Sequence, residues 1–132
     1  VGLHYHLHQA DYWYVPIGTC RVVLHDLRVG SPTDGATQVI DIGARADGTH
    51  DHRGIFIPPG VAHGFASLTD MTITYLVDSY YNPKDELGLA YNDKAVKADW
   101  GIAKPILSDR DAANPTRDAI DSQVRPFWPM RT

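Results

Sequence analysis

Cysteine is scarce in this chain, and long hydrophobic runs and clusters of basic residues do not occur in it. Cys20 is the single cysteine, which excludes an intrachain disulfide and a zinc site built from several cysteines. No apolar run approaches the ~20 residues that a membrane helix needs. The 12 Lys and Arg are scattered among 16 Asp and Glu, for a formal net charge of -4, so no nucleic-acid surface is indicated. We expect a soluble cytoplasmic protein with neither a membrane nor a nucleic-acid partner.

The order of short β-prone segments predicts an all-β protein. The 132 residues fit one domain, 1–132, with a sizeable core. From residue 82 onward the chain is rich in loops, with one short helix expected near residues 108–113. Many short strands with frequent turns indicate an antiparallel sandwich or jelly-roll barrel. The expected strands begin with a histidine-bearing segment and continue at residues 10–15, 20–28, 36–42, 54–57, 63–68 and 71–81.

Histidine is over-represented near the start of the chain. Of the seven histidines, three fall at alternate positions, His4, His6 and His8. Side chains alternate between the two faces of a strand, so these three imidazoles are expected on one face. The simpler alternative for His6 and His8 is a polar strand face that binds nothing. His50 and His52 fall in a polar stretch and are expected to be solvated.

Two spaced motifs extend this pattern. His4-x-His6 is followed after four residues by Asp11 and after six more by Gly18, which resembles the first cupin motif with Asp where Glu is usual. Pro58-x-Gly60-x-x-His63 resembles the second cupin motif. The set His4, His6, Asp11 and His63 would suit a divalent transition metal such as Fe(II), Mn, Ni, Co or Zn. A metal-dependent cupin, an oxygenase or a metal-assisted isomerase, is therefore one hypothesis.

Short motifs follow one another along nearly the whole chain. They include Gly-Leu-His-Tyr at residues 2–5, Ile-Pro-Pro-Gly-Val-Ala-His-Gly-Phe at 57–65, Tyr-Tyr-Asn-Pro at 80–83 and Leu-Ser-Asp-Arg-Asp at 107–111. Shorter ones fall at residues 26–28, 31–33, 35, 75, 86, 92–93 and 100. In this order the motifs resemble the dTDP-4-dehydrorhamnose 3,5-epimerase family of nucleotide-sugar cupins. The resemblance implies a cupin jelly-roll barrel, an epimerase acting on a 4-keto-6-deoxy nucleotide sugar, no cofactor and a homodimer.

The resemblance also assigns roles to individual residues. Epimerisation beside a carbonyl removes a C–H proton, forms an enolate and returns a proton to the opposite face. His4 would be the base, Asp111 would hold its second ring nitrogen, and Tyr75 would be the acid. His63, Tyr81 and His6 would line the sugar pocket. Two local alternatives stay open, since Asp111 could cap the helix near residues 108–113 and Tyr75 could be a core residue.

The chain departs from the family pattern at several charged positions. Val1 stands where the family has an Arg that contacts the pyrophosphate, and His6 stands where it has Gln. Asp11 stands where the family has a Lys that steadies the enolate, and Tyr14 replaces another basic residue. A metal at His4, His6, Asp11 and His63 could supply the missing charge, but His4 could not then be the free base. A sugar-binding cupin without catalytic activity is a third hypothesis.

Overall fold

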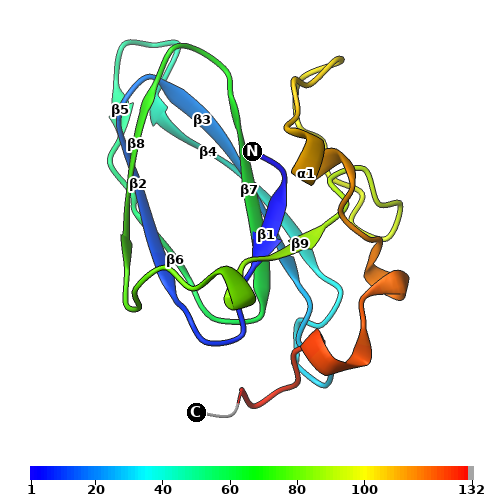
Figure 1. The fold of residues 1–132 in the computed structure, drawn as a ribbon. Coiled ribbons are helices and arrows are strands. Elements are labelled where there is room, and N and C mark those ends of the chain that lie inside the picture. The colour runs from blue at the N-terminus through cyan, green and yellow to red at the C-terminus, as the bar shows by residue number, and fades with distance from the viewer. Residues whose placement is uncertain (131–132) are drawn as a thin grey trace.

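The computed structural model describes residues 1–130, which form two facing antiparallel sheets (Figure 1). The larger sheet has the strand order β5-β4-β3-β7-β1-β9, and the smaller has the order β6-β2-β8. The strands are β1 (Leu3–Tyr5), β2 (Asp11–Ile17), β3 (Thr19–Asp26), β4 (Thr37–Ala44), β5 (His50–Asp51), β6 (Ile55–Ile57), β7 (Val61–Ser67), β8 (Thr72–Val77) and β9 (Leu87–Leu89). All pairs of named strands are antiparallel, which agrees with the prediction of an all-β fold.

Alternation along the strands creates two apolar cores, one on each face of the larger sheet. On β3, Cys20 and Val22 face the smaller sheet, while Val23 faces the opposite way. The core between the sheets contains Trp13, Val15, Cys20, Val22, Ile42, Ile55, Ile57 and Val61. The second core contains Leu3, Tyr5, Val23, Leu27, Ala62, Leu89, Val96 and Ile120. The molecule therefore has three layers, with the larger sheet in the middle.

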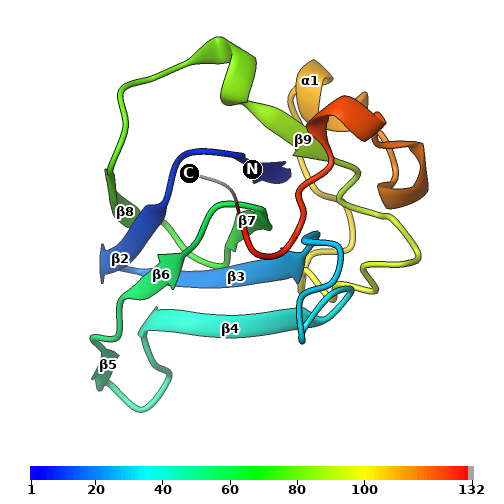
Figure 2. The same ribbon diagram turned by 90° about the horizontal axis from the view of Figure 1, so that it is seen from below.

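The third layer is the C-terminal part of the chain. Figure 2 shows it beside β9, with a long loop that leads from β9 to the helix α1 (Asp109–Ala112). The expected short helix at residues 108–113 is thus confirmed. Three single-turn 3-10 helices complete the described elements: η1 (Pro83–Asp85), η2 (Arg117–Ala119) and η3 (Ser122–Val124). Among residues 1–130 no helix is long and apolar enough to cross a membrane.

Two of the expected strands are shorter than predicted. The first ends at Tyr5, because the N–H groups of Leu7 and His8 donate to the carboxylate of Asp85 at 2.7 and 3.1 Å rather than to a neighbouring strand. His8 consequently leaves the shared histidine face and is exposed. The strand expected at residues 71–81 covers only Thr72–Val77.

The predicted solvation of His50 and His52 is wrong for His50. His50 lies on the two-residue strand β5, and both of its ring nitrogens are buried without a hydrogen-bond partner among the described residues. Its ring stacks on that of His52 with the centroids 4.1 Å apart. His52 is exposed and its Nδ1 lies 2.9 Å from the hydroxyl of Tyr14. Tyr14, on β2 of the smaller sheet, therefore hydrogen-bonds to His52 and lies close to the ring of His50.

Candidate active site

A cavity of about 290 Å³ lies between the two sheets. Strand β1 and strand β7 of the larger sheet provide one wall, and β2 and β8 of the smaller sheet provide the other. Its lining combines imidazoles, carboxylates and aromatic rings, and no lysine or arginine among residues 1–130 belongs to it. The lining residues are Val1, His4, His6, Gln9, Asp11, Trp13, His63, Phe65, Ile73, Tyr75 and Glu86.

His4 reaches this cavity because of its position on β1. Its neighbours Leu3 and Tyr5 are buried in the core on the other face of the sheet, so alternation turns His4 inward. The Nε2 of His4 lies 2.7 Å from Oδ1 of Asp111. If Nε2 donates to this carboxylate, the lone pair of the ring is on Nδ1. This arrangement gives His4 the geometry of an imidazole base oriented by a carboxylate.

Hydrogen bonds with Ser108 and Gly2 fix the position of Asp111 beside His4. The hydroxyl of Ser108 accepts the Asp111 N–H and begins α1, so the Asp111 carboxylate is free to point away from its own helix. Its Oδ2 accepts the N–H of Gly2 at 2.9 Å. Burial alone would raise the pKa of Asp111, but the hydrogen bonds from Gly2 and His4 outweigh burial and lower the pKa. The carboxylate is therefore charged near neutral pH.

The lack of a side chain at Gly2 gives Asp111 room for this contact. A Cβ at this position would lie 3.0 Å from both Cβ and Cγ of Asp111, which is tighter than ordinary van der Waals contact. The close approach lets the Gly2 N–H, just before β1, donate directly to the carboxylate. The first residues of the described chain and the helix α1 are thus joined at the site.

Tyr75 enters the cavity from the opposite sheet. It pairs across β2 and β8 with Trp13, and the two rings lie 6.4 Å apart. Trp13 is buried between the sheets, so the register places Tyr75 on the inner face of β8. The side chain is 58% exposed, which leaves its hydroxyl accessible. His4 and Tyr75 therefore stand on different sheets with the cavity between them.

His6, Asp11 and His63 form a buried cluster at the same cavity. The Asp11 carboxylate accepts hydrogen bonds from the Gln9 amide at 2.8 Å and the Trp13 indole at 3.1 Å. His63 is the register partner of His4 on β7. Burial holds the pKa of His63 well below its ordinary value, so its imidazole is neutral near pH 7.

The structure brings most of the residues singled out in the sequence into this cavity. Of the four suggested metal ligands, His6, Asp11 and His63 are clustered, whereas His4 is bound to Asp111. Tyr81 is not brought there: β8 ends at Val77, and Tyr81 is 73% exposed in the following loop. Several cavity residues were not anticipated, namely Gln9, Trp13, Phe65, Ile73 and Glu86. Alternation along β2 could have placed Trp13 beside Asp11, but nothing local identifies Glu86.

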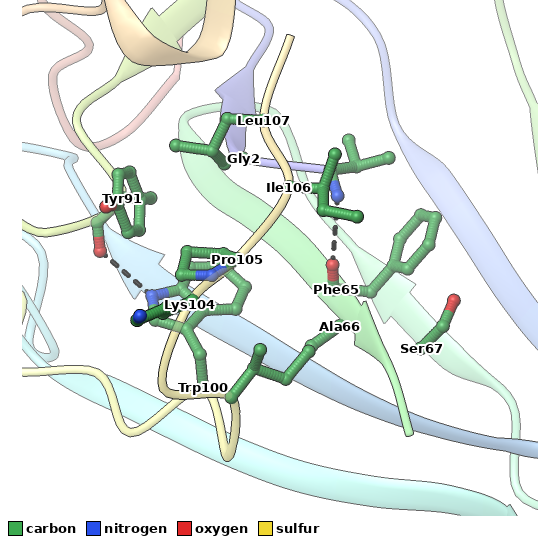
Figure 3. A pocket seen from close by; sticks show the side chains of 12 residues that line it. Gly2, Phe65, Ala66, Ser67, Tyr91, Trp100, Lys104, Pro105, Ile106 and Leu107 are labelled. Carbon is green, nitrogen blue, oxygen red and sulfur yellow. Dashed lines mark hydrogen bonds between the residues drawn. The ribbon is translucent and has the colours of Figure 1, made fainter. Parts of the chain in front are cut away.

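A second cavity of about 300 Å³ lies where β7 meets the segment before α1 (Figure 3). Trp100, Pro105, Ile106 and Leu107 form much of its apolar wall. No histidine or carboxylate is among its lining residues, and Lys104 is its one lysine. It therefore offers apolar contact but no acid and base pair. The chemically competent site is the cavity between the sheets.

Comparison with known proteins gives a consistent result. The family model described as dTDP-4-dehydrorhamnose 3,5-epimerase matches residues 1–118. A dTDP-4-dehydrorhamnose 3,5-epimerase of Mycobacterium tuberculosis is 37% identical over 125 residues, which are 91% of this chain and 59% of the relative. The chain thus spans about six tenths of that relative's length.

Two solved structures have the same fold. The dTDP-6-deoxy-D-glucose-3,5-epimerase of Legionella pneumophila, in complex with dTDP-4-keto-L-rhamnose, aligns with a TM-score of 0.83 and 31% identity, covering 96% of this chain and 67% of that one. NovW, a 4-keto-6-deoxy sugar epimerase of Streptomyces spheroides, aligns with a TM-score of 0.88 and 29% identity, covering all of this chain and 66% of that one.

Proposed function

Because the chain belongs to the dTDP-4-dehydrorhamnose 3,5-epimerase family, we propose that it epimerises a dTDP-linked 4-keto-6-deoxy sugar beside its carbonyl group. The observation that carries the proposal is the pairing of His4 with Asp111 on one wall of the cavity, opposite Tyr75 on the other. The ligand of the Legionella relative, dTDP-4-keto-L-rhamnose, has the required carbonyl and supports this substrate class. The cavity expected from the cupin resemblance is the place where the sugar binds.

In this reaction His4 is the base. The Nδ1 lone pair of His4 removes the proton from the carbon beside the carbonyl, and the electrons of the C–H bond move to form the enolate. Asp111, charged and hydrogen-bonded to Nε2, stabilises the imidazolium that results. The carboxylate also fixes which ring nitrogen carries the proton, so the free nitrogen is oriented before the substrate arrives.

Tyr75 is the acid in the second half of the reaction. Its hydroxyl donates a proton to the enolate carbon from the side opposite His4, and this inverts the configuration. The two groups can act on opposite faces of one sugar because they come from different sheets. No electrons are gained or lost overall, so the reaction needs no redox cofactor. His63 on β7 and His6, which directly follows β1, line the cavity proposed for the sugar.

We also propose that the protein forms a homodimer, as the family resemblance implies. An exposed row of large apolar side chains crosses the outer face of the smaller sheet and supports this. Tyr12 is the register partner of both Phe56 and Leu76, and the three are 43%, 63% and 67% exposed. A continuous apolar row of this kind is typical of a surface that another protein covers.

Solvent deuterium exchange tests the proposed reaction. The protein is incubated in D₂O with dTDP-4-keto-6-deoxy-D-glucose, and the sugar is examined by NMR and mass spectrometry. We expect deuterium at a carbon beside the carbonyl, together with an epimerised product. Binding of the nucleotide sugar without any incorporation of deuterium would contradict the proposal and would favour a sugar-binding protein without catalytic activity. Heat-denatured protein is the control for spontaneous exchange.

A further inference from the structure

The two buried imidazoles beside Asp11 have their ring nitrogens fixed by the backbone. Nδ1 of His6 lies 2.7 Å from the carbonyl oxygen of Asp85, and Nδ1 of His63 lies 2.9 Å from that of Val61. A carbonyl oxygen can only accept, so each Nδ1 carries a hydrogen and donates. In a neutral imidazole the other nitrogen, Nε2, then has the lone pair. The backbone thus fixes the same tautomer in both rings.

Both Nε2 atoms point toward one carboxylate. The Nε2 of His6 lies 3.9 Å from Oδ1 of Asp11, and the Nε2 of His63 lies 3.8 Å from Oδ2. All three residues are 5% exposed, and their possible ligand atoms lie within 4.8 Å of one another. Lone pairs that face a carboxylate in a buried site repel one another unless positive charge or donated hydrogens lie between them.

The hydrogen-bond donors near this cluster serve only some of its acceptor atoms. The Gln9 amide nitrogen donates to Asp11 and lies 3.4 Å from Nε2 of His6, and the Trp13 indole also donates to Asp11. Nε2 of His63 has no hydrogen-bond donor among residues 1–130. Among residues 1–130 no lysine or arginine side chain lines the cavity. Within the part of the chain that the structure describes, an imidazole acceptor and a carboxylate therefore face each other at the cavity without a cation.

We propose that His6, Asp11 and His63 bind a divalent first-row transition-metal ion, through Nε2 of each imidazole and one carboxylate oxygen. Two imidazoles and a carboxylate are a common ligand set for such ions, and this set leaves coordination positions open toward the cavity. Hydrogen bonds from the second ring nitrogen to backbone carbonyls are the usual outer support of metal-binding histidines.

The cluster has to contract to hold an ion. Ligand atoms about 2.1 Å from a metal lie roughly 3 to 3.5 Å from one another. The distances of 3.9 and 3.8 Å run to different oxygens of Asp11, and the three possible ligand atoms lie within 4.8 Å of one another, so the required closure is up to about 1.5 Å. The ion replaces the Gln9 amide as the positive partner of Asp11, and Gln9 turns away. His4 takes no part, since Asp111 holds its Nε2.

The metal site would add a catalytic group to the proposed epimerase reaction. Only this catalytic role depends on the proposed function, and the binding of the ion does not. An enolate oxygen needs a positive group or a hydrogen-bond donor beside it. A metal ion at this cluster would supply that charge as a Lewis acid, in a cavity where the described residues provide no lysine or arginine. Binding of the ion itself can be measured without substrate.

Cobalt is a suitable probe because Co²⁺ bound by histidine absorbs visible light. Protein freed of metal with a chelator is titrated with Co²⁺, and the absorbance and the bound metal are measured. We expect saturation at one equivalent per chain for the wild-type protein and no such band for His63→Gln or Asp11→Asn. His6→Gln is a further test if either variant fails to fold by circular dichroism. The controls are His8→Gln and His52→Gln, which change exposed histidines outside the cluster.

The outcomes separate this inference from the proposed function. The metal site is overturned if the wild-type protein shows no saturable band, or if His63→Gln keeps the band while His52→Gln loses it. Saturable binding without any deuterium exchange into the keto sugar would support the metal site and contradict the proposed function. Exchange by a wild-type protein that binds no Co²⁺ would support the function and contradict the metal site.

Discussion

The Nε2 atom of His4 lies 2.7 Å from Oδ1 of Asp111, although 107 positions of the sequence separate the two residues. His4 belongs to β1 of the middle layer, and Asp111 belongs to α1 of the C-terminal layer. The proposed base is therefore complete only when the C-terminal layer has packed on the larger sheet. This relationship makes the loop-rich C-terminal part of the chain a component of the active site.

Replacing Asp111 with Asn should slow the reaction strongly and leave substrate binding nearly unchanged. The amide can still accept the Gly2 N–H, but it cannot stabilise an imidazolium by its charge. We expect kcat to fall by about 10²–10⁴-fold with little change in KM. Asp109→Asn, which alters an exposed carboxylate of the same helix, is the matched control. Equal losses in both variants would mean that the charge of the helix matters rather than the contact with His4.

Replacing Tyr75 with Phe should separate proton removal from inversion. His4 can still take the proton and exchange it with solvent, but no acid remains on the opposite face. We expect deuterium to enter the keto sugar while formation of the epimer falls by about 100-fold or more. NMR of the recovered sugar distinguishes the two results. Tyr80→Phe, which changes a tyrosine that is 99% exposed, serves as the control. Unchanged epimer formation in Tyr75→Phe would rule out this residue as the acid.

The buried carboxylate of Asp26 should make the fold sensitive to acid. Its oxygens accept hydrogen bonds from Arg28, Ser31 and Thr33 at 2.6 to 3.0 Å. Burial alone would raise the pKa of Asp26, but these bonds outweigh it and hold the pKa well below the ordinary value. A folded-state pKa below the unfolded value of about 3.9 stabilises the fold above that pH. The stabilisation is lost progressively as the pH falls further.

Asp26→Asn measures that contribution. At pH 7 we expect the free energy of unfolding to fall by about 2–4 kcal/mol, because the amide cannot replace a charged acceptor of several donors. The difference from the wild-type protein should shrink in urea denaturation at successively lower pH, below about pH 4. Asp118→Asn, at an exposed carboxylate, should show no comparable loss. A difference that stays constant down to pH 2 would contradict this account.

The proposed dimer predicts a response to charge on the smaller sheet. Phe56→Glu places a carboxylate at one end of the exposed apolar row, beside Tyr12. Burial of that charge in an interface is unfavourable, so we expect the variant to be monomeric and the wild-type protein dimeric in light scattering coupled to size exclusion. Val39→Glu, at an exposed position of the larger sheet, is the control. A monomeric wild-type protein would contradict the proposal.

The alternation of side chains along a strand explains which residue positions could be predicted from the sequence alone. It placed His4 on one face of the first strand, and the structure turns that face to the cavity because Leu3 and Tyr5 are buried on the other face. It misplaced His8, because the strand ends where Asp85 takes over the backbone hydrogen bonds. A hydrogen bond from a residue far along the chain leaves no periodic signal in the segment that it terminates.

The role of Asp111 could be anticipated from the family resemblance but not from its spacing. The residues before it resemble an ordinary helix start, and Ser108 does form that start. Its carboxylate is used elsewhere, since it accepts the Gly2 N–H and binds His4. Gln9 and Glu86 were not foreseen at the cavity, because their positions depend on how the chain turns after β1 and before β9.

Asp85 has a consequence for the design of variants with altered loops. Its carboxylate fixes the backbone at Leu7 and His8, and its carbonyl fixes the ring of His6. The Asn82 side chain in turn accepts the Lys84 N–H at the start of η1. Insertions after residue 82 would therefore disturb the histidine cluster itself. Asp78 is also fixed, because it exchanges hydrogen bonds with the backbone of Ala10 beside the cavity. Residues 79–81, between Asp78 and this anchored turn, are the place where the length of the loop can be varied while the cavity keeps its shape.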